Sequence, residues 1–327
     1  MCRNGKQKMT QKITHHLDYL TYSVAWPDYV WEWPIDDQEA RNIIRTCVPH
    51  LHVSGKPYER PEGSFANGMK GYSRTYDYGY ATAHVDPQRR DMKVGIRMAG
   101  QELGAWRDLG GNDERLVNFV RGAKGSTSRV DIAFDLFNYG IDVPRMYADW
   151  KKGKVKGHFR KARPYTEGVM QPSGEVTEAT TVYFGAGSSD LMVRVYEKGK
   201  EQNTDLDWVR IELEIKGDKA KTVMADMARL GVADVGRQLL RDYFTVMPYK
   251  FWKQLVLGES VELTSVGRKM TEREAWIRNV VFPVLREEIS KEWDEMIETG
   301  MTRDIEALIR EHWTTRAIAI RKQYGLL

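Results

Sequence analysis

The segment Arg129–Asp135 alternates polar and apolar residues in the way that a half-buried β-strand does. Because side chains alternate across a strand, Asp131 and Asp135 would share one face with Arg129, while the apolar residues between them pack on a core. Aspartate is unfavourable in strands, so two aspartates on one strand indicate a role beyond folding.

A second segment, Arg210–Lys216, repeats this pattern with glutamates, and Glu212 and Glu214 would share a face. If the two segments are neighbouring strands, up to four carboxylates gather on one sheet face, where their repulsion must be offset by cations. Hard oxygen ligands of this kind suit Mg²⁺ or Mn²⁺. The alternative is an exposed sheet face on which arginines simply pair with the acids.

A third segment, Thr181–Lys200, places a tyrosine between two cations. Two short strands flank a Gly/Ser turn here, and Arg194, Tyr196 and Lys198 would share one face of the second strand. Neighbouring positive charges favour a phenolate, which is the nucleophilic form of tyrosine. The chain has 16 tyrosines, so this spacing alone leaves open whether Tyr196 is a nucleophile or an ordinary half-buried strand residue.

A cationic run, Lys151–Arg163, follows the first acidic segment and contains no acid. A solvated surface loop and a contact with a nucleic-acid backbone are the two interpretations, and the absence of acids favours the second. The basic residues of this run are Lys151, Lys152, Lys154, Lys156, Arg160, Lys161 and Arg163.

The composition of the 327-residue chain narrows the classes of protein to which it can belong. Its formal charge of +4 is a mild excess that is compatible with binding a polyanion. No apolar run approaches the roughly 20 residues of a membrane-spanning helix, and the polar N-terminus is not typical of a signal or an anchor. We therefore expect a cytoplasmic protein without a membrane partner. Cys2 and Cys47 form no CxxC pair, which argues against a disulfide framework or a thiolate zinc site.

The periodicity of apolar residues predicts an α+β fold, in which an antiparallel β-sheet with flanking helices is followed by an all-helical C-terminal region. We expect a disordered basic N-terminus over residues 1–10, an α+β domain over 11–217 and the helical region over 218–327. The expected strands are Ile13–Ala25, Tyr72–Val85, Met92–Ala99, Ser128–Phe137, Thr180–Phe184, Met192–Tyr196 and Trp208–Lys216. The expected helices are Ile35–Cys47, Glu114–Arg121, Lys219–Leu230, Asp234–Val246, Lys250–Leu257, Thr271–Glu298 and Thr302–Tyr324.

Histidines and aromatic residues offer further candidates for a site. His15 and His16 are adjacent, so on a strand they would point to opposite faces, and we interpret both as structural. Exposed aromatic residues could stack on unpaired bases, although such residues are more typical of core packing. The candidates are Trp26, Trp31, Trp33, Tyr76, Tyr78 and Tyr80.

In this order, the three segments resemble the replication initiation factor family, which includes rolling-circle initiators of plasmids and phages and relaxases of integrative and conjugative elements. The matching blocks are the strand Arg129–Asp135, the turn Tyr183–Ser189 with Arg194–Lys198, and the strand Arg210–Lys216. The resemblance extends from Asp18 through Arg97–Gln101 to Trp252 and Trp276. The turn lacks the basic residue of many relatives, and the chain lacks the His-hydrophobic-His pair of other tyrosine relaxases.

The resemblance implies site-specific nicking and rejoining of DNA at a replication or transfer origin, through a 5′-phosphotyrosine intermediate. It implies that Tyr196 is the nucleophile and that acids of the flanking strands hold Mg²⁺ or Mn²⁺. Arg194 and Lys198 would then lower the pKa of the tyrosine or bind phosphate, and Arg129 and Arg210 would orient the carboxylates or contact DNA. The implied metal ligands are Asp131, Asp135, Glu212 and Glu214.

The implied partner is origin DNA with an extruded or single-stranded nick site. The C-terminal region would bind this DNA, mediate a homodimer, or dock a helicase or a coupling ATPase. Two alternative functions remain at this point. One is a non-enzymatic, sequence-specific DNA-binding protein in which the acids only form salt bridges. The other is a metal-dependent hydrolytic nuclease that forms no covalent intermediate.

Overall fold

The computed structural model describes residues 10–26, 34–47, 71–89, 91–123, 125–170, 174–246, 249–258 and 260–264. Residues 1–9, Trp31, Trp33, Trp276 and the expected helices Thr271–Glu298 and Thr302–Tyr324 lie outside these ranges. The chain divides into two units, Met1–Val266 and Gly267–Leu327, and every described residue belongs to the first. The expected domain boundary after residue 217 therefore falls inside the first unit.

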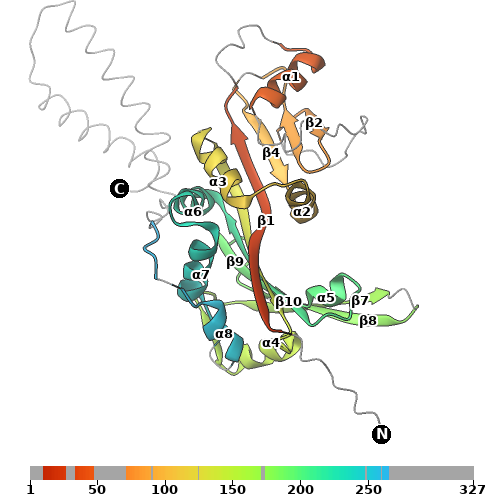
Figure 1. Ribbon diagram of the computed structural model, residues 1–327, viewed down its shortest axis with the longest axis vertical. Coiled ribbons are helices and arrows are strands. Elements are labelled where there is room, and N and C mark those ends of the chain that lie inside the picture. The colour runs from red at the N-terminus through yellow and green to blue at the C-terminus, as the bar shows by residue number, and fades with distance from the viewer. Residues whose placement is uncertain are drawn as a thin grey trace, which may run out of the picture. The chain divides into compact units, whose positions relative to one another are not determined.

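An antiparallel β-sheet forms the body of the described chain, with the strand order β2-β3-β4-β1-β5-β10-β9-β8-β7 (Figure 1). Its strands are β1 (Lys12–Val24), β2 (Arg74–Asp77), β3 (Thr82–Val85), β4 (Val94–Met98), β5 (Ser126–Phe137), β7 (Ala162–Met170), β8 (Val176–Phe184), β9 (Leu191–Tyr196) and β10 (Trp208–Lys216). A smaller two-stranded sheet pairs β6 (Val155–Gly157) with β11 (Phe244–Val246).

The described helices flank the large sheet, which confirms the predicted α+β class. They are α1 (Asp37–Cys47), α2 (Gly100–Asp108), α3 (Asp113–Gly122), α4 (Val143–Lys151), α5 (Lys198–Glu201), α6 (Gly217–Leu230), α7 (Val232–Tyr243) and α8 (Lys250–Leu255). No helix among the described residues has the length and apolar character needed to cross a membrane.

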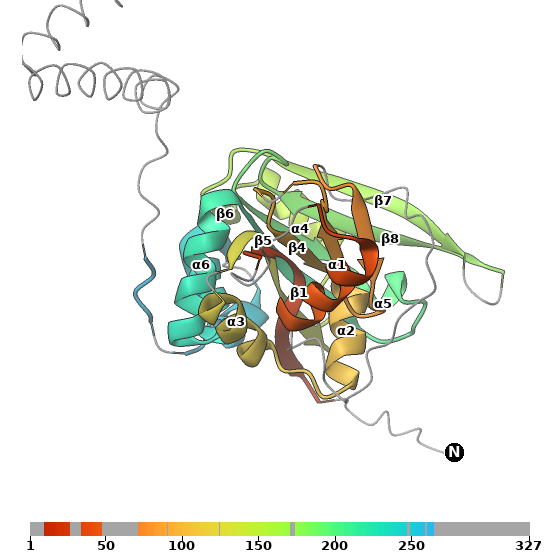
Figure 2. The same cartoon turned by 90° about the horizontal axis from the view of Figure 1, so that it is seen from above.

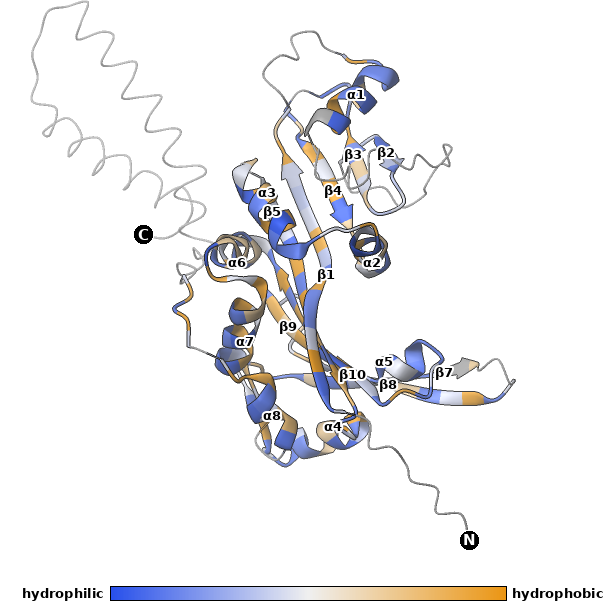
Figure 3. Cartoon of the chain, in the orientation of Figure 1, coloured by the Kyte–Doolittle hydropathy of each residue, from blue (hydrophilic) through white to orange (hydrophobic). Residues whose placement is uncertain are grey.

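The two faces of the central strands differ in what covers them. Helices α6 and α7 lie on one side of these strands, whereas α2 and α5 lie on the other (Figures 1 and 2). Hydrophobic and hydrophilic segments alternate along the strands (Figure 3), because successive side chains point to opposite faces. The apolar side chains, including Ile132 and Phe134 of β5, are fully buried against the helices, so the polar side chains of the same strands face α2 and α5.

Two expected elements differ from the structure in an informative way. The run Tyr72–Val85 was expected as one strand but forms the hairpin β2–β3, because Gly79 adopts a positive φ of 78° and its N–H donates to the Asp77 carboxylate at 2.7 Å. The expected helix Asp234–Val246 ends at Tyr243, and its last residues form β11. The described part of the C-terminal region is therefore not entirely helical.

Helix α7 approaches β5 closely because its Gly236 has no side chain. A Cβ at this position would lie 2.8 Å from Phe134 Cζ and 3.0 Å from Ile132 Cγ2, both of which belong to buried side chains. We predict that Gly236→Ala lowers the free energy of unfolding by about 1–2 kcal/mol, since overpacking outweighs the gain in helix propensity. Urea denaturation of the purified protein measures this change.

Gly104→Ala is the matched control, because a Cβ at this position in α2 meets nothing within 4 Å. It should raise stability by about 0.5–1 kcal/mol through helix propensity alone. Equal effects of the two substitutions would contradict the close packing of α7 on β5.

Candidate active site

Strands β5 and β10 are neighbours, which brings the two acidic segments together. Their antiparallel register pairs Asp131 with Glu214 and Ala133 with Glu212. Because paired residues point to the same side, the acids of both strands share the face turned towards α2 and α5. We call this the site face. The prediction that the two acidic segments are adjacent strands is confirmed.

Strand β9 adds the tyrosine segment to the same face. Its register with β10 pairs Tyr196 with Arg210 and Arg194 with Glu212. The three sequence segments that are distant along the chain therefore meet on three adjacent strands. This arrangement follows from the alternation of apolar residues, because a shift of one residue in either pairing would turn the charged side chains into the core.

Asp135 is fully engaged by groups of strand β10. Arg210 donates to both of its carboxylate oxygens, from Nε at 2.7 Å and from Nη2 at 3.0 Å, and Trp208 Nε1 donates at 2.6 Å. The third nitrogen of the same guanidinium, Nη1, donates to Asp18 at 2.7 Å. Arg210 is itself buried, so its position suits it to orienting Asp135 and Asp18 rather than to contacting DNA.

Glu214 likewise has its own cations. Arg129 Nη2 lies 2.8 Å from one of its oxygens and Lys216 Nζ lies 2.5 Å from the other. The Arg129 guanidinium also donates to Asp131, from Nε at 2.9 Å, and stacks on the Tyr19 ring at 4.2 Å. Of the two predicted glutamate ligands, Glu214 is therefore bound by both an arginine and a lysine, whereas the cation that binds Glu212 is Arg194.

Asp131 and Glu212 form the centre of the site face. Both side chains are buried, and Arg194 Nη2 binds Asp131 and Glu212 together. Burial raises the pKa of Glu212, and the Asp131 charge raises it further against the opposing effect of Arg194. Burial also raises the pKa of Asp131. The two acids therefore share the Arg194 guanidinium, and Asp131 is also bound by Arg129.

Ala133 is a small residue among these acids. It lies between Asp131 and Asp135 on β5, opposite Glu212 on β10 and His16 on β1. Its side chain is completely buried, so a longer side chain at this position would displace its neighbours on the site face.

Strand β1 contributes two residues that the sequence analysis did not assign to the site. A β-bulge between Leu17 and Tyr19 places Asp18 as an extra residue facing Arg210. His16 Nε2 lies 3.6 Å from Asp18 Oδ1, and His16 Nδ1 lies 3.6 Å from an Asp135 oxygen. Although burial opposes this effect, His16 and Arg210 together lower the pKa of Asp18. His16 thus lies at the site and is more than a packing residue of the strand.

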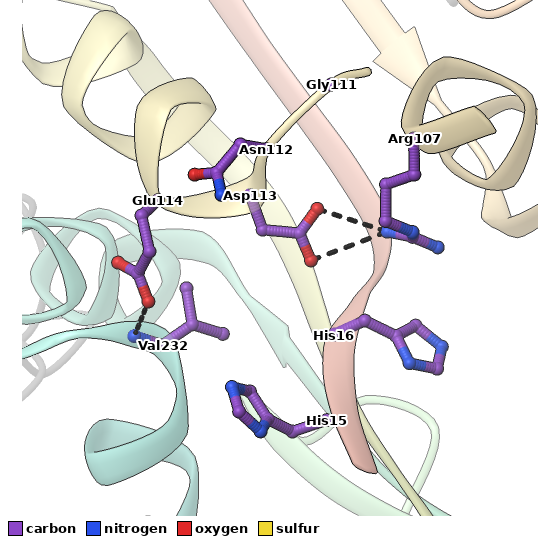
Figure 4. Close-up of a pocket in the computed structure, with 8 residues that line it drawn as sticks. All are labelled: His15, His16, Arg107, Gly111, Asn112, Asp113, Glu114 and Val232. Carbon is purple, nitrogen blue, oxygen red and sulfur yellow. Dashed lines mark hydrogen bonds and ion pairs between the residues drawn. The ribbon is translucent and has the colours of Figure 1, made fainter. Parts of the chain in front are cut away.

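Side chains from the neighbouring helices hold the bulge in place. Leu17 N donates to Asp113 Oδ2 at 2.8 Å, and Arg107 Nη1 donates both to Leu17 O and to Asp113 Oδ1 at 3.1 Å. Figure 4 shows this pair beside a cavity of about 220 Å³, with His15 and His16 pointing to opposite sides of β1. The backbone groups that the bulge removes from the sheet ladder are therefore bound by an ion pair.

Tyr196 points to the acids and is hydrogen-bonded to one of them. Its hydroxyl donates to Glu212 Oε2 at 3.2 Å. The expectation that flanking cations favour its phenolate is wrong, because burial and then the Glu212 charge raise the pKa of Tyr196. Arg194 is engaged with the acids, and Lys198 begins α5 and donates to Glu201 at 2.7 Å. The acceptor that the Tyr196 hydroxyl contacts in the structure is therefore Glu212 and not a cation that would favour the phenolate.

The four predicted metal ligands share the site face but do not converge into one cluster. Among the described residues, no three His, Cys, Asp or Glu side chains are arranged to hold a metal ion. Arginine or lysine side chains bind each of the four acids instead. Asp131 and Glu212 differ from the other two acids in that one guanidinium, that of Arg194, bridges both of them. Hard oxygen donors in such a pair fit a divalent cation in place of that guanidinium.

The cationic run spans several elements. Lys151 ends α4, Lys156 lies in β6, and Arg163 lies in β7. All seven basic side chains are exposed. Of these residues, Arg163 has a register position on the large sheet, opposite Tyr183 of β8. The aromatic candidates Tyr76, Tyr78 and Tyr80 are instead buried, which confirms that they pack in the core.

Comparisons with known proteins find similarity to a family model, to a sequence relative and to a solved structure. A sequence model described as replication initiation factor matches residues 125–287. The chain is 26% identical over 218 residues to a Bacillus subtilis (strain 168) protein named as a DNA relaxase, NicK; the match covers 63% of this chain and spans 60% of the length of that relative. The fold of this chain resembles that of a solved rolling-circle replication initiator from Geobacillus stearothermophilus, with a TM-score of 0.56 and 23% sequence identity. The similarity covers 76% of this chain and 94% of the solved chain.

We predict that Asp113→Ala destabilises the protein by about 1–3 kcal/mol, because Leu17 N and Arg107 lose their acceptor. Hydrogen exchange at the Leu17 amide should accelerate at the same time. Asp242→Ala is the control, since Asp242 is exposed and binds only Gln238 among the contacts that the structure describes for it. It should change stability by no more than about 0.5 kcal/mol. An unchanged exchange rate at Leu17 would contradict the role of Asp113 in holding the bulge.

Proposed function

We propose that this chain, whose residues 125–287 match the replication initiation factor family, nicks and rejoins one strand of DNA at a replication or transfer origin, with Tyr196 as the nucleophile. One observation carries the proposal. The Tyr196 hydroxyl donates to Glu212 at 3.2 Å on a sheet face lined by acids and arginines. A nucleophile bound to its base, which is oriented in turn by a third group, is the usual arrangement for covalent catalysis.

The proposed step is a transesterification. Tyr196 Oη attacks the phosphorus of one phosphodiester while its proton passes to Glu212. The bond from phosphorus to the 3′-oxygen breaks, the 3′-oxygen takes up a proton from water and leaves as a hydroxyl, and the 5′-phosphate remains on the tyrosine. Attack of the 3′-hydroxyl on this phosphotyrosine reverses the step and rejoins the strand. No nucleotide cofactor is needed, because the number of phosphoester bonds is unchanged.

The arginines around the site divide into two roles. The side chains of Arg194 and Arg129 are 26% and 29% exposed, so their guanidinium groups can meet a phosphate at the surface of the site face. Arg210 is buried and orients Asp135 and Asp18. In this proposal, the partly exposed Arg194 and Arg129 stabilise the negative charge of the scissile phosphate.

A divalent cation, Mg²⁺ or Mn²⁺, would be held by Asp131 and Glu212, which are the buried acids that share Arg194. Such an ion would supply positive charge to the phosphate oxygens at that position. Asp135 and Glu214 would act indirectly. Asp135 fixes Arg210, which also binds Asp18, and Glu214 fixes Arg129, which also binds Asp131.

Replacing Tyr196 with phenylalanine tests the nucleophile. Tyr196→Phe should abolish the covalent protein–DNA adduct on a supercoiled plasmid that carries the origin, while the affinity for DNA changes less than about twofold. Tyr139→Phe is the control, because Tyr139 binds Gln254 away from the site face and should leave adduct formation unchanged. An adduct formed by Tyr196→Phe would exclude this residue, and nicking by the unchanged protein without any adduct would indicate a hydrolytic nuclease.

The acids are tested by metal binding as well as by activity. Asp131→Asn should lower nicking by more than about 100-fold, which exceeds the 10–100-fold effect typical of groups that only support a ligand. It should also weaken Mn²⁺ binding in calorimetry, whereas Glu214→Gln, which removes a partner of Arg129 and Lys216, should leave Mn²⁺ affinity almost unchanged. Full nicking in the presence of a chelator would show that the acids serve only to hold arginines.

A further inference from the structure

Two rows of paired residues extend from the nucleophile to the edge of the sheet. In the first row, Tyr196 of β9 pairs with Thr181 of β8, which pairs with Tyr165 of β7. Because paired residues on adjacent strands point to the same side, Tyr165 lies on the site face. Two strand spacings separate its backbone from that of Tyr196, which is roughly 10 Å.

The second row runs beside the first. Arg194 pairs with Tyr183 of β8, which pairs with Arg163 of β7. The Arg163 guanidinium lies over the Tyr183 ring, 4.9 Å from its centroid. Arg194, at the inner end of this row, bridges Asp131 and Glu212. The row therefore connects the central acids of the site face with Arg163 on β7.

The outer ends of both rows are open to solvent. Tyr165 is 54% exposed, in contrast to the buried tyrosines of the β2–β3 hairpin, and the side chain of Arg163 is also exposed. An aromatic ring that packs on no core, next to a cation stacked on a second ring, has the composition of a surface that binds unpaired bases and their phosphates.

The position of these residues on the fold favours nucleic acid over another strand of protein. The hairpin β7–β8 extends away from the rest of the sheet (Figures 1 and 2), and β7 is its edge strand. Pro164 lies between Arg163 and Tyr165, and a proline on an edge strand lacks the backbone donor that strand addition uses. Edge pairing with a second copy of the chain is therefore disfavoured at this position.

The chemistry also limits how far a bound strand follows the hairpin. Glu167 is the next residue of β7 on the site face after Tyr165, and it is exposed. A carboxylate at this position repels phosphates, so the favourable surface ends at Tyr165. Bases inside a duplex are stacked on one another and cannot reach an isolated ring, whereas bases of a single strand can.

We propose that single-stranded DNA next to the scissile phosphate crosses β8 and β7 on the site face. A phosphate binds Arg163 where this side chain stacks on Tyr183, and an unpaired base stacks on Tyr165. We call this surface, made of Arg163, Tyr165 and Tyr183, the strand track. The inference rests on the proposed function for its direction, since Tyr196 defines where the strand begins, but the binding surface itself does not depend on cleavage.

The test measures binding of the full-length protein to a fluorescent oligothymidylate and to a duplex of the same length. Tyr165→Ala should weaken oligothymidylate binding by roughly tenfold, as expected for the loss of one stacked base. Duplex binding should change less than about twofold. Tyr165→Trp should retain the affinity, because it preserves the stacking surface. Arg163→Gln should weaken binding and reduce its dependence on salt, because one phosphate contact is lost.

Thr166→Ala is the matched control, since Thr166 is the neighbour of Tyr165 on the opposite face of β7 and bonds to Thr180. It should leave oligothymidylate binding unchanged. Equal affinity of Tyr165→Ala and the unchanged protein would overturn the strand track, and so would an equal loss of single-strand and duplex binding. Thermal melting of each variant checks that the fold is intact, as expected for exposed positions.

Adduct formation, measured in parallel, separates this inference from the proposed function. If the unchanged protein forms the phosphotyrosine adduct while Tyr165→Ala binds normally, the strand track is wrong and the nicking activity stands. If no adduct forms but Tyr165→Ala loses oligothymidylate binding and Tyr165→Trp retains it, the surface stands as a binding site and the proposed activity fails.

Discussion

Carboxylates can be buried on one face of a β-sheet only if cations lie beside them, because an uncompensated charge in a dry interior is strongly unfavourable. In this protein the cations come from the same strands. Arg210 binds Asp135 and Asp18, and Arg194 joins Asp131 to Glu212. Each of these arginines binds acids on two other strands and so links three neighbouring strands of the sheet. The strand register and the charge balance of the site therefore depend on one another.

The same burial determines how Tyr196 can react. A dry, acid-rich face disfavours the phenolate, and the pKa of this tyrosine is raised rather than lowered. The flanking cations do not reverse this effect, because Arg194 and Lys198 have their own acidic partners. In the proposed mechanism the proton leaves through the hydrogen bond to Glu212, so that the proposed nucleophile and the central acids would act as a single unit.

Sequence patterns predicted the central strands well, because alternation is a local property that survives folding. The expected strand Trp208–Lys216 coincides with β10, and Ser128–Phe137 differs from β5 only by two residues at its start. Adjacency of the acidic strands was a condition of the predicted site, and the sheet order meets it. The pattern did not reveal β7, whose exposed residues, including Pro164 and Gly168, do not alternate between core and solvent.

The parts of the site that sequence missed depend on contacts between distant residues. Asp18 reaches Arg210 through a bulge that breaks the alternation of β1, and the bulge is held by Asp113 from a helix about a hundred residues later. No spacing within β1 signals this arrangement. His16 was assigned a structural role for the same reason. The sequence also could not predict which cations bind Glu212 and which bind Glu214, because this depends on the register of β10 with β5 and with β9.

The most direct test of the account is to identify the amino acid that becomes attached to DNA. The covalent complex formed by the unchanged protein would be digested with trypsin and nuclease, and the nucleotide-bearing peptide sequenced by mass spectrometry. If the DNA strand is transferred to the Tyr196 hydroxyl, we expect a single modified peptide, in which the nucleotide is attached to Tyr196 between Val195 and Glu197. A nucleotide attached to any other tyrosine, serine or acid would contradict the central claim.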